Sequence, residues 1–165
     1  MQTPQENMKP QAKDFGKIMK RVEESTPNKQ RRKTAKNRRR EHFSSNLIRT
    51  LLEMLMTVKM YHWRTESYAQ HKATDDLYDK LNKNIDTFVE VFLGKSESRI
   101  QEVDEILPLY NFQKGNDFKK KIFEYRKMLQ DLSKIFSPQT DSDLLTVRDE
   151  LLININQFLY LMTFH

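Results

Sequence analysis

The chain has 165 residues, of which 32% are Lys, Arg, Asp or Glu, as expected for one soluble domain. It contains no cysteine, which excludes disulfides and thiolate metal sites and leaves His, Asp and Glu as the candidate metal ligands. Its three glycines are too few for the Gly-rich loops that bind phosphates and dinucleotides, so nucleotide chemistry is not expected.

The sequence also argues against a membrane or secreted protein. No apolar run approaches the roughly 18 residues that span a bilayer, and the first residues, MQTPQENMKP, lack the apolar stretch of a signal peptide. We therefore expect an intracellular protein, or one packaged inside a viral particle, that makes no membrane contact.

Charge is divided unevenly along the chain. Residues 1–40 carry a balance of +9 and residues 41–165 a balance of −3. The stretch from Asn28 to Arg40, NKQRRKTAKNRRR, has no acid and no large apolar side chain, so we expect it to be disordered when alone. Just before it, KDFGKIMKRV has apolar residues at helical spacing, which predicts one short amphipathic turn. We accordingly divide the chain into a basic, flexible arm, residues 1–42, and a folded domain, residues 43–165.

The folded domain contains four segments in which apolar residues recur every three or four positions, the period of an amphipathic helix. The first stripe consists of Leu47, Ile48, Leu51, Leu52, Leu55, Val58 and His62. The second consists of Leu77, Leu81, Ile85, Phe88 and Phe92. The third consists of Phe118, Ile122, Tyr125, Leu129, Leu132 and Phe136, and the fourth of Leu144, Val147, Leu151, Ile155, Phe158 and Met162. Gly94 and Pro138 are expected to end the second and third helices, and Asp141 or Ser142 to cap the fourth. Four such helices predict an all-α four-helix bundle.

The connections between these helices predict its topology. Short links join helices one and two around 65–70, and helices three and four around 137–141, so each pair should form an antiparallel hairpin. The link between helices two and three, residues 95–116, is longer, and its segment ESRIQEVDEI could form a short helix. A long middle crossover is the connectivity of ferritin-like bundles.

Acidic residues of the second helix lie opposite its apolar stripe. At about 100° per residue, Asp79, Asp86 and Glu90 fall on the face that points away from the bundle's own core. These carboxylates are either a solvated surface or half of a metal site completed by a second subunit. His62 and His71 likewise have two interpretations, as ligands or as hydrogen-bonded hairpin residues.

The residues around these positions resemble the Dps branch of the ferritin superfamily, the mini-ferritins that protect DNA during starvation. The resemblance rests on the His62–Trp63 pair, on His71, on DDLYD from Asp75 to Asp79 and on IDTFVE from Ile85 to Glu90. The last helix, DSDLLTVRDELLININQFLYLMTF, is also similar, so the resemblance covers about residues 43–164. Dps-like proteins of large DNA viruses and phages are included in this resemblance.

The resemblance implies an iron site between two subunits. His62 and His71 of one chain, with Asp75 as a further candidate, would face Asp86 and Glu90 of its twofold mate. It implies Fe(II) oxidation, storage of the mineral and a homo-oligomer, at least a dimer and up to a dodecameric shell. The departure from the family is the spacing between His62 and His71, which is three residues shorter than usual and predicts a weakened or lost site.

The basic arm predicts non-specific DNA binding, since Lys and Arg neutralise phosphates without distinguishing bases. The eight candidate contact residues are Lys29, Arg31, Arg32, Lys33, Lys36, Arg38, Arg39 and Arg40. A solubilising tail or a nuclear-import signal is the simpler alternative for such a cluster. Two functions are therefore expected from different classes: a nucleoid-associated, DNA-binding mini-ferritin with ferroxidase activity, or a non-catalytic structural component of a virion or nucleoprotein particle that also contacts other virion proteins.

Overall fold

The four predicted helices are present in a computed structural model. It describes the backbone of residues 29–97, 99 and 107–164, and the side chains of these residues except 29–34, 36 and 37. The helices are α2 (Lys29–Arg64), α3 (Tyr68–Lys95), α4 (Gly115–Asp131) and α5 (Ser142–Leu161), with a 3-10 turn η1 (Leu132–Lys134) after α4. Because no strand occurs in these described ranges, the all-α prediction is confirmed for them. None of the described helices has the length and apolar character needed to cross a membrane.

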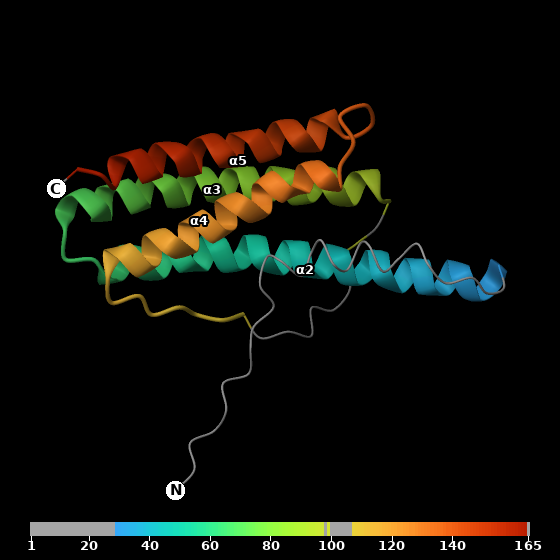
Figure 1. The fold of residues 1–165 in the computed structure, drawn as a ribbon, viewed down its shortest axis with the longest axis horizontal. Coiled ribbons are helices and arrows are strands. Elements are labelled where there is room, and N and C mark those ends of the chain that lie inside the picture. Colours follow the sequence, from blue (N-terminus) through green and yellow to red (C-terminus); the bar gives the residue numbers. More distant parts are fainter. Residues whose placement is uncertain (1–28, 98, 100–106, 165) are drawn as a thin grey trace, which may run out of the picture.

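The helices lie side by side along one common direction (Figure 1). α2 and α3 form one antiparallel hairpin and α4 and α5 form another, whereas α3 and α4 run the same way. The most extensive packing is between α3 and α5 and between α2 and α3. α3 ends and α4 begins at opposite ends of the bundle.

α2 begins earlier than predicted. We expected disorder up to Arg40 and a helix from Phe43, but the described backbone is helical from Lys29. Burial nevertheless begins where the apolar stripe begins: Arg38 to His42 are exposed, Phe43 is half-buried and Leu47 is buried. The physical reason is helix propagation, since Lys, Arg, Gln and Ala are strong helix formers that extend a helix already anchored by packing. The prediction of disorder up to Arg40 therefore differs from the structure from Lys29 onward.

The predicted apolar stripes form the core. Every stripe residue named above is buried apart from two: Val147 is half-buried, and Leu52 is 37% exposed. Met54, Tyr61, Met128 and Leu145 also belong to the core, although the stripes did not include them. The predicted face of each helix is thus confirmed, while its width was underestimated.

The helix ends differ in detail from the prediction. The third helix ends at Asp131 and tightens into η1, so the last two residues of its stripe, Leu132 and Phe136, lie beyond the α-helix. Asp141 occupies the N-cap position of α5 but makes no side-chain capping bond. Its carboxylate accepts a hydrogen bond from the Ser137 backbone N–H at 3.0 Å instead, which closes the α4–α5 turn. The predicted turn in KDFGKIMKRV and the predicted short helix in ESRIQEVDEI lie outside the described residues, apart from Glu97 and Arg99.

Aromatic rings gather at the two ends of the bundle. At one end, which we call the phenylalanine end, Phe43, Phe88, Phe92 and Phe136 pack with ring centroids 6.1–6.5 Å apart. At the other, the hairpin end, the rings of Tyr61 and Phe118 stack at 3.9 Å. The phenylalanine end is closed by apolar contact, whereas the hairpin end adds the polar groups described next.

Candidate metal and nucleic-acid sites

The hairpin between α2 and α3 is held together by short-range hydrogen bonds. Ser67 is the N-cap of α3 and accepts a bond from the Gln70 N–H at 3.4 Å. The Gln70 side-chain oxygen accepts from Tyr61 Oη at 2.6 Å and from Thr65 Oγ1 at 3.0 Å. A Cβ at Gly115 would lie 3.0 Å from Tyr61 Oη, so the start of α4 approaches this cluster closely enough that a larger residue would have to displace the Tyr61 hydroxyl. The link is thus short, capped and rigidly packed.

This hairpin brings His62 and His71 together. Their rings stack with centroids 3.9 Å apart. His62 Nδ1 lies 3.1 Å from the His71 carbonyl oxygen, and His71 Nδ1 lies 3.1 Å from the His62 carbonyl oxygen. Because a carbonyl only accepts, both Nδ1 atoms carry the proton, and both Nε2 atoms are available as acceptors in the neutral rings. A backbone carbonyl that fixes Nδ1–H is the usual arrangement of a metal-ligating histidine.

Asp75 extends the histidine pair. Its Oδ1 lies 3.8 Å from His62 Nε2, at a position where His62 is buried and Asp75 is part-exposed. The two groups form an ion pair only when the His62 ring carries a second proton. Bonds of about 2.1 Å from one cation would reach both atoms.

Asp86 and Glu90 do not join this cluster within one chain. Both are exposed on α3, as is Asp79, which agrees with the prediction that these carboxylates point away from the core. Asp86 follows Asp75 by 11 residues, which places it roughly 16 Å further along α3. Among the described residues, no group of three or more His, Asp or Glu could hold a metal ion. The described part of one chain therefore does not assemble the predicted ligand set.

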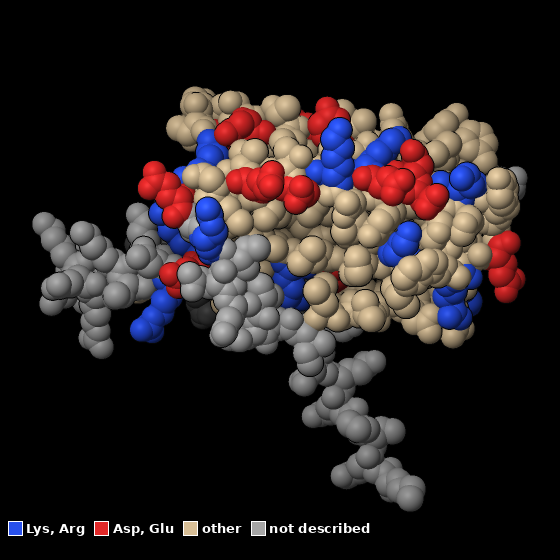
Figure 2. All heavy atoms as spheres, turned by 180° about the vertical axis from the view of Figure 1, so that it is seen from behind, with Lys and Arg blue, Asp and Glu red and all other residues tan. Residues whose placement is uncertain are grey.

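The basic candidates lie on the first part of α2, which extends past the ends of the other helices (Figure 1). Arg38, Arg39 and Arg40 are exposed. Lys29, Arg31, Arg32, Lys33 and Lys36 lie in the same helix, but their side chains are outside the described set. On the face seen in Figure 2, carboxylates gather in rows over the half of the bundle that holds α3 and α5. Lys and Arg side chains lie between these carboxylates, whereas Arg38, Arg39 and Arg40 form an uninterrupted basic run on α2.

A protein-family profile described as a family of unknown function, DUF5856, matches residues 62–162, which is more than half of the chain. The chain belongs to this family. The matched segment starts at His62 and includes His71, Asp75, Asp86 and Glu90, whereas the basic part of α2 lies before it. No curated protein and no solved structure matches the chain.

A buried polar cluster joins α2 to the DUF5856 segment, and the sequence analysis missed it. Glu53, only 6% exposed, accepts hydrogen bonds from Tyr125 Oη and Lys121 Nζ, each at 3.0 Å. Burial disfavours the charged form of Lys121 and so lowers its pKa. The hydrogen bond and the attraction to Glu53 outweigh this effect, and the pKa of Lys121 is raised. Burial raises the pKa of Tyr125 far above its usual value, so its hydroxyl stays protonated and donates to Glu53. The signal in the sequence was Glu53, a charged residue directly before the core residue Met54. Helical spacing alone could not identify the partners of Glu53 on α4.

Proposed function

We propose that this DUF5856 protein is a homo-oligomeric, non-specific nucleic-acid-binding protein on a Dps-like, ferritin-like bundle, and that the basic first part of α2 contacts the phosphate backbone. The helix directions support the ferritin-like assignment, since two antiparallel hairpins joined by a parallel crossover are the arrangement of that fold. The DNA would be bound within a nucleoid or a viral particle.

The exposed arginines on α2 carry this proposal. Arg38, Arg39 and Arg40 lie on a helix that is continuous with the packed part of α2 but extends beyond the bundle, so they can approach phosphates without steric conflict. No aromatic residue occurs between Lys29 and His42, which removes base stacking as a binding mode. Contacts to phosphate alone make affinity dependent on salt and independent of sequence.

A charge-matched pair of variants tests the proposal. In the first, Arg38→Gln, Arg39→Gln and Arg40→Gln remove three cations from α2 and keep helix propensity. In the control, Lys72→Gln, Lys83→Gln and Lys114→Gln remove three exposed cations from elsewhere. Duplex binding is measured by fluorescence anisotropy from 50 to 300 mM salt. The slope of log K against log salt is negative, and we expect the first variant to make it shallower by about 2.7. The control should leave this slope unchanged. Equal losses in both variants would contradict the proposal, because binding would then follow net charge and not α2.

Iron oxidation at an inter-subunit site is a second candidate function, favoured by the fixed tautomers of His62 and His71. In a twofold dimer that pairs the α2–α3 faces, Asp86 and Glu90 of the partner subunit would complete the ligand set begun by the two histidines and Asp75. Mixed imidazole and carboxylate ligands suit Fe(II), which would be the substrate of a ferroxidase.

The ferroxidase candidate is tested by mixing Fe(II) with the protein in air and following oxidation by absorbance. Asp86→Ala with Glu90→Ala should remove any acceleration over buffer, since both residues are exposed and their loss leaves the core intact. The control, Asp149→Ala with Glu150→Ala, removes two exposed carboxylates from α5 and should keep it. Absence of acceleration in the wild type would leave the non-catalytic alternative, a structural component of a virion or nucleoprotein particle.

A further inference from the structure

The first part of α2, residues 29–42, is helical although its charges repel one another. Cations lie four residues apart, where like charges destabilise a helix, in three pairs: Lys29 with Lys33, Arg32 with Lys36, and Lys36 with Arg40. No acidic residue occurs between Lys29 and Arg40 to offset this repulsion. An anionic partner that neutralises these charges removes the repulsion, so binding of such a partner and the stability of this helix reinforce each other.

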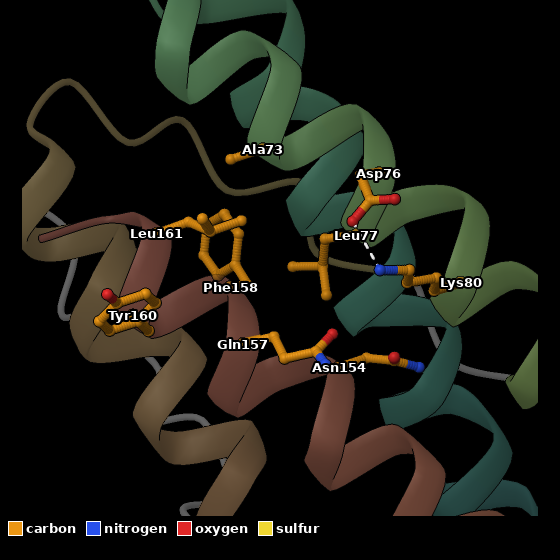
Figure 3. A pocket seen from close by; sticks show the side chains of 9 residues that line it. All are labelled: Ala73, Asp76, Leu77, Lys80, Asn154, Gln157, Phe158, Tyr160 and Leu161. Atoms are coloured by element: carbon orange, nitrogen blue, oxygen red, sulfur yellow. Dashed lines mark hydrogen bonds and ion pairs between the residues drawn. The ribbon is translucent and has the colours of Figure 1, made fainter. Parts of the chain in front are cut away.

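Cations on the helices of the bundle are arranged differently. Lys80 binds Asp76, four residues earlier, at 2.7 Å, beside a groove between α3 and α5 that Asn154 also lines (Figure 3). Lys127 binds Asp131, four residues later, at 2.7 Å. Such pairs stabilise a helix from within. In the first part of α2 the charge is instead left for a partner to neutralise.

Neutral polar residues form a stripe along this same part of α2. At about 100° per residue, the positions of Gln30, Thr34 and Asn37 follow one another along one side of the helix. Cationic positions border the stripe on both flanks, with Lys29, Lys33, Lys36 and Arg40 on one and Arg31 and Arg38 on the other. The helical backbone thus places one neutral row between two cationic rows.

This arrangement matches the major groove of B-form DNA. The groove is about 12 Å wide and admits an α-helix, whose diameter is roughly 10–12 Å. Phosphates border it on both sides, and every base pair presents hydrogen-bonding atoms at its floor. Residues 29–42, which precede the half-buried Phe43, give about 21 Å of helix for such a contact. A helix lying there meets anions on two flanks and polar base edges between them.

We propose that the first part of α2 binds double-stranded DNA by lying in its major groove, with the neutral stripe toward the floor and the two cationic flanks on phosphates of opposite strands. The inference rests on the nucleic-acid binding proposed above and adds its substrate class, a B-form duplex. Arg39, on the side away from the stripe, is long enough to reach a phosphate at the rim of the groove. Because every base pair offers hydrogen-bonding atoms to the stripe, this mode requires no particular base sequence.

The shape of the duplex tests this mode. Double-stranded RNA carries the same phosphate charge, but its major groove is deep and narrow and does not admit the helix. We expect the full chain to bind a DNA duplex at least about tenfold more tightly than an RNA duplex of the same sequence and length. Fluorescence anisotropy at one fixed salt concentration measures both affinities.

Equal affinities for the two duplexes would overturn the major-groove proposal and leave phosphate binding by α2 intact. Absence of salt-dependent binding to either duplex would instead remove the proposed function together with this inference. The two failures are therefore distinguishable in one titration series.

A matched pair of single substitutions tests which side of the helix faces the DNA. Thr34→Glu places a carboxylate in the stripe, between the two rows of phosphates. Ala35→Glu makes the same change of net charge at the next position, which is exposed and lies outside the stripe. Each new carboxylate has an arginine four residues later, Arg38 or Arg39, so both variants gain the same kind of helix-stabilising pair.

We expect Thr34→Glu to weaken DNA binding about tenfold or more and Ala35→Glu about threefold or less, since only the first carboxylate lies in the groove. Equal losses would show that binding follows net charge, and would overturn the proposal.

A proline substitution tests the helix itself. Ala35→Pro interrupts the first part of α2 and keeps all its charges, so the preference for DNA over RNA should fall to about twofold or less. Gln30→Pro, in the first turn of the helix, where proline is tolerated, should keep the preference. An unchanged preference in Ala35→Pro would overturn the proposal, because the helix would then not be the element that recognises the duplex.

Discussion

The two ends of the bundle are built differently. The phenylalanine end closes with edge-to-face phenylalanines from α2, α3 and the α4–α5 turn, and Lys95 ties that turn to α3 by bonds to Thr140 O and Asp143. At the hairpin end Phe118 stacks on Tyr61 and also contacts Phe112 and Phe158, and the Tyr61 hydroxyl belongs to a hydrogen-bonded polar cluster. The difference leads us to expect a large share of the stability from the phenylalanine end, and sensitivity to the loss of hydrogen bonds at the hairpin end.

The largest effect is expected at the phenylalanine end. Phe88 is fully buried and contacts Phe92 and Phe136, so Phe88→Ala should lower the free energy of unfolding by about 3–5 kcal/mol. Urea denaturation followed by circular dichroism measures this, with Phe123→Ala, 44% exposed, as a control expected below about 1 kcal/mol. A loss below about 1 kcal/mol for Phe88→Ala would remove the assignment of stability to this end.

The stability of the hairpin end should also respond to the loss of a hydrogen-bond acceptor. Gln70→Ala leaves the hydroxyls of Tyr61 and Thr65 without their common acceptor, which should cost about 1–2 kcal/mol. Gln130→Ala, at an exposed position of α4, is the control and should be nearly neutral. If both variants unfold at the same urea concentration, the polar cluster does not stabilise this end.

The two helical glycines, one at each end, should respond with opposite signs to the same substitution. At Gly94 a Cβ would meet nothing within 4 Å, so Gly94→Ala should stabilise the protein by about 0.5–1 kcal/mol. At Gly115 the Cβ would press on Tyr61 Oη at 3.0 Å, and Tyr61 cannot shift because it is stacked on Phe118 and bonded to Gln70. Gly115→Ala should therefore destabilise by about 1 kcal/mol. Melting temperatures that move in the same direction would show that the hairpin end is more loosely packed than described.

The smallest effect concerns acid sensitivity at the phenylalanine end. The Ser137 backbone N–H lowers the pKa of Asp141, and Lys95 lowers the pKa of Asp143. Because these pKa values are lower in the folded state, the two carboxylates stabilise the fold above about pH 4, and that contribution is lost as pH falls through their folded values. The decrease in urea midpoint between pH 6 and pH 3 should therefore be smaller in Asp141→Asn than in the wild type. An equal decrease would show that other groups control acid unfolding.

The sequence by itself determined the helix class, the four core faces and the outward direction of Asp79, Asp86 and Glu90, because these follow from a period of 3.6 residues that each helix carries locally. It also predicted a set of candidate metal ligands, but not their arrangement. Only the tertiary structure decided that His62 and His71 stack and exchange hydrogen bonds, that Glu53 meets Lys121 and Tyr125, and that Asn154 faces a groove. Each of these contacts joins two helices, and the rotation and axial register of one helix against another are set by packing, which no single helix encodes.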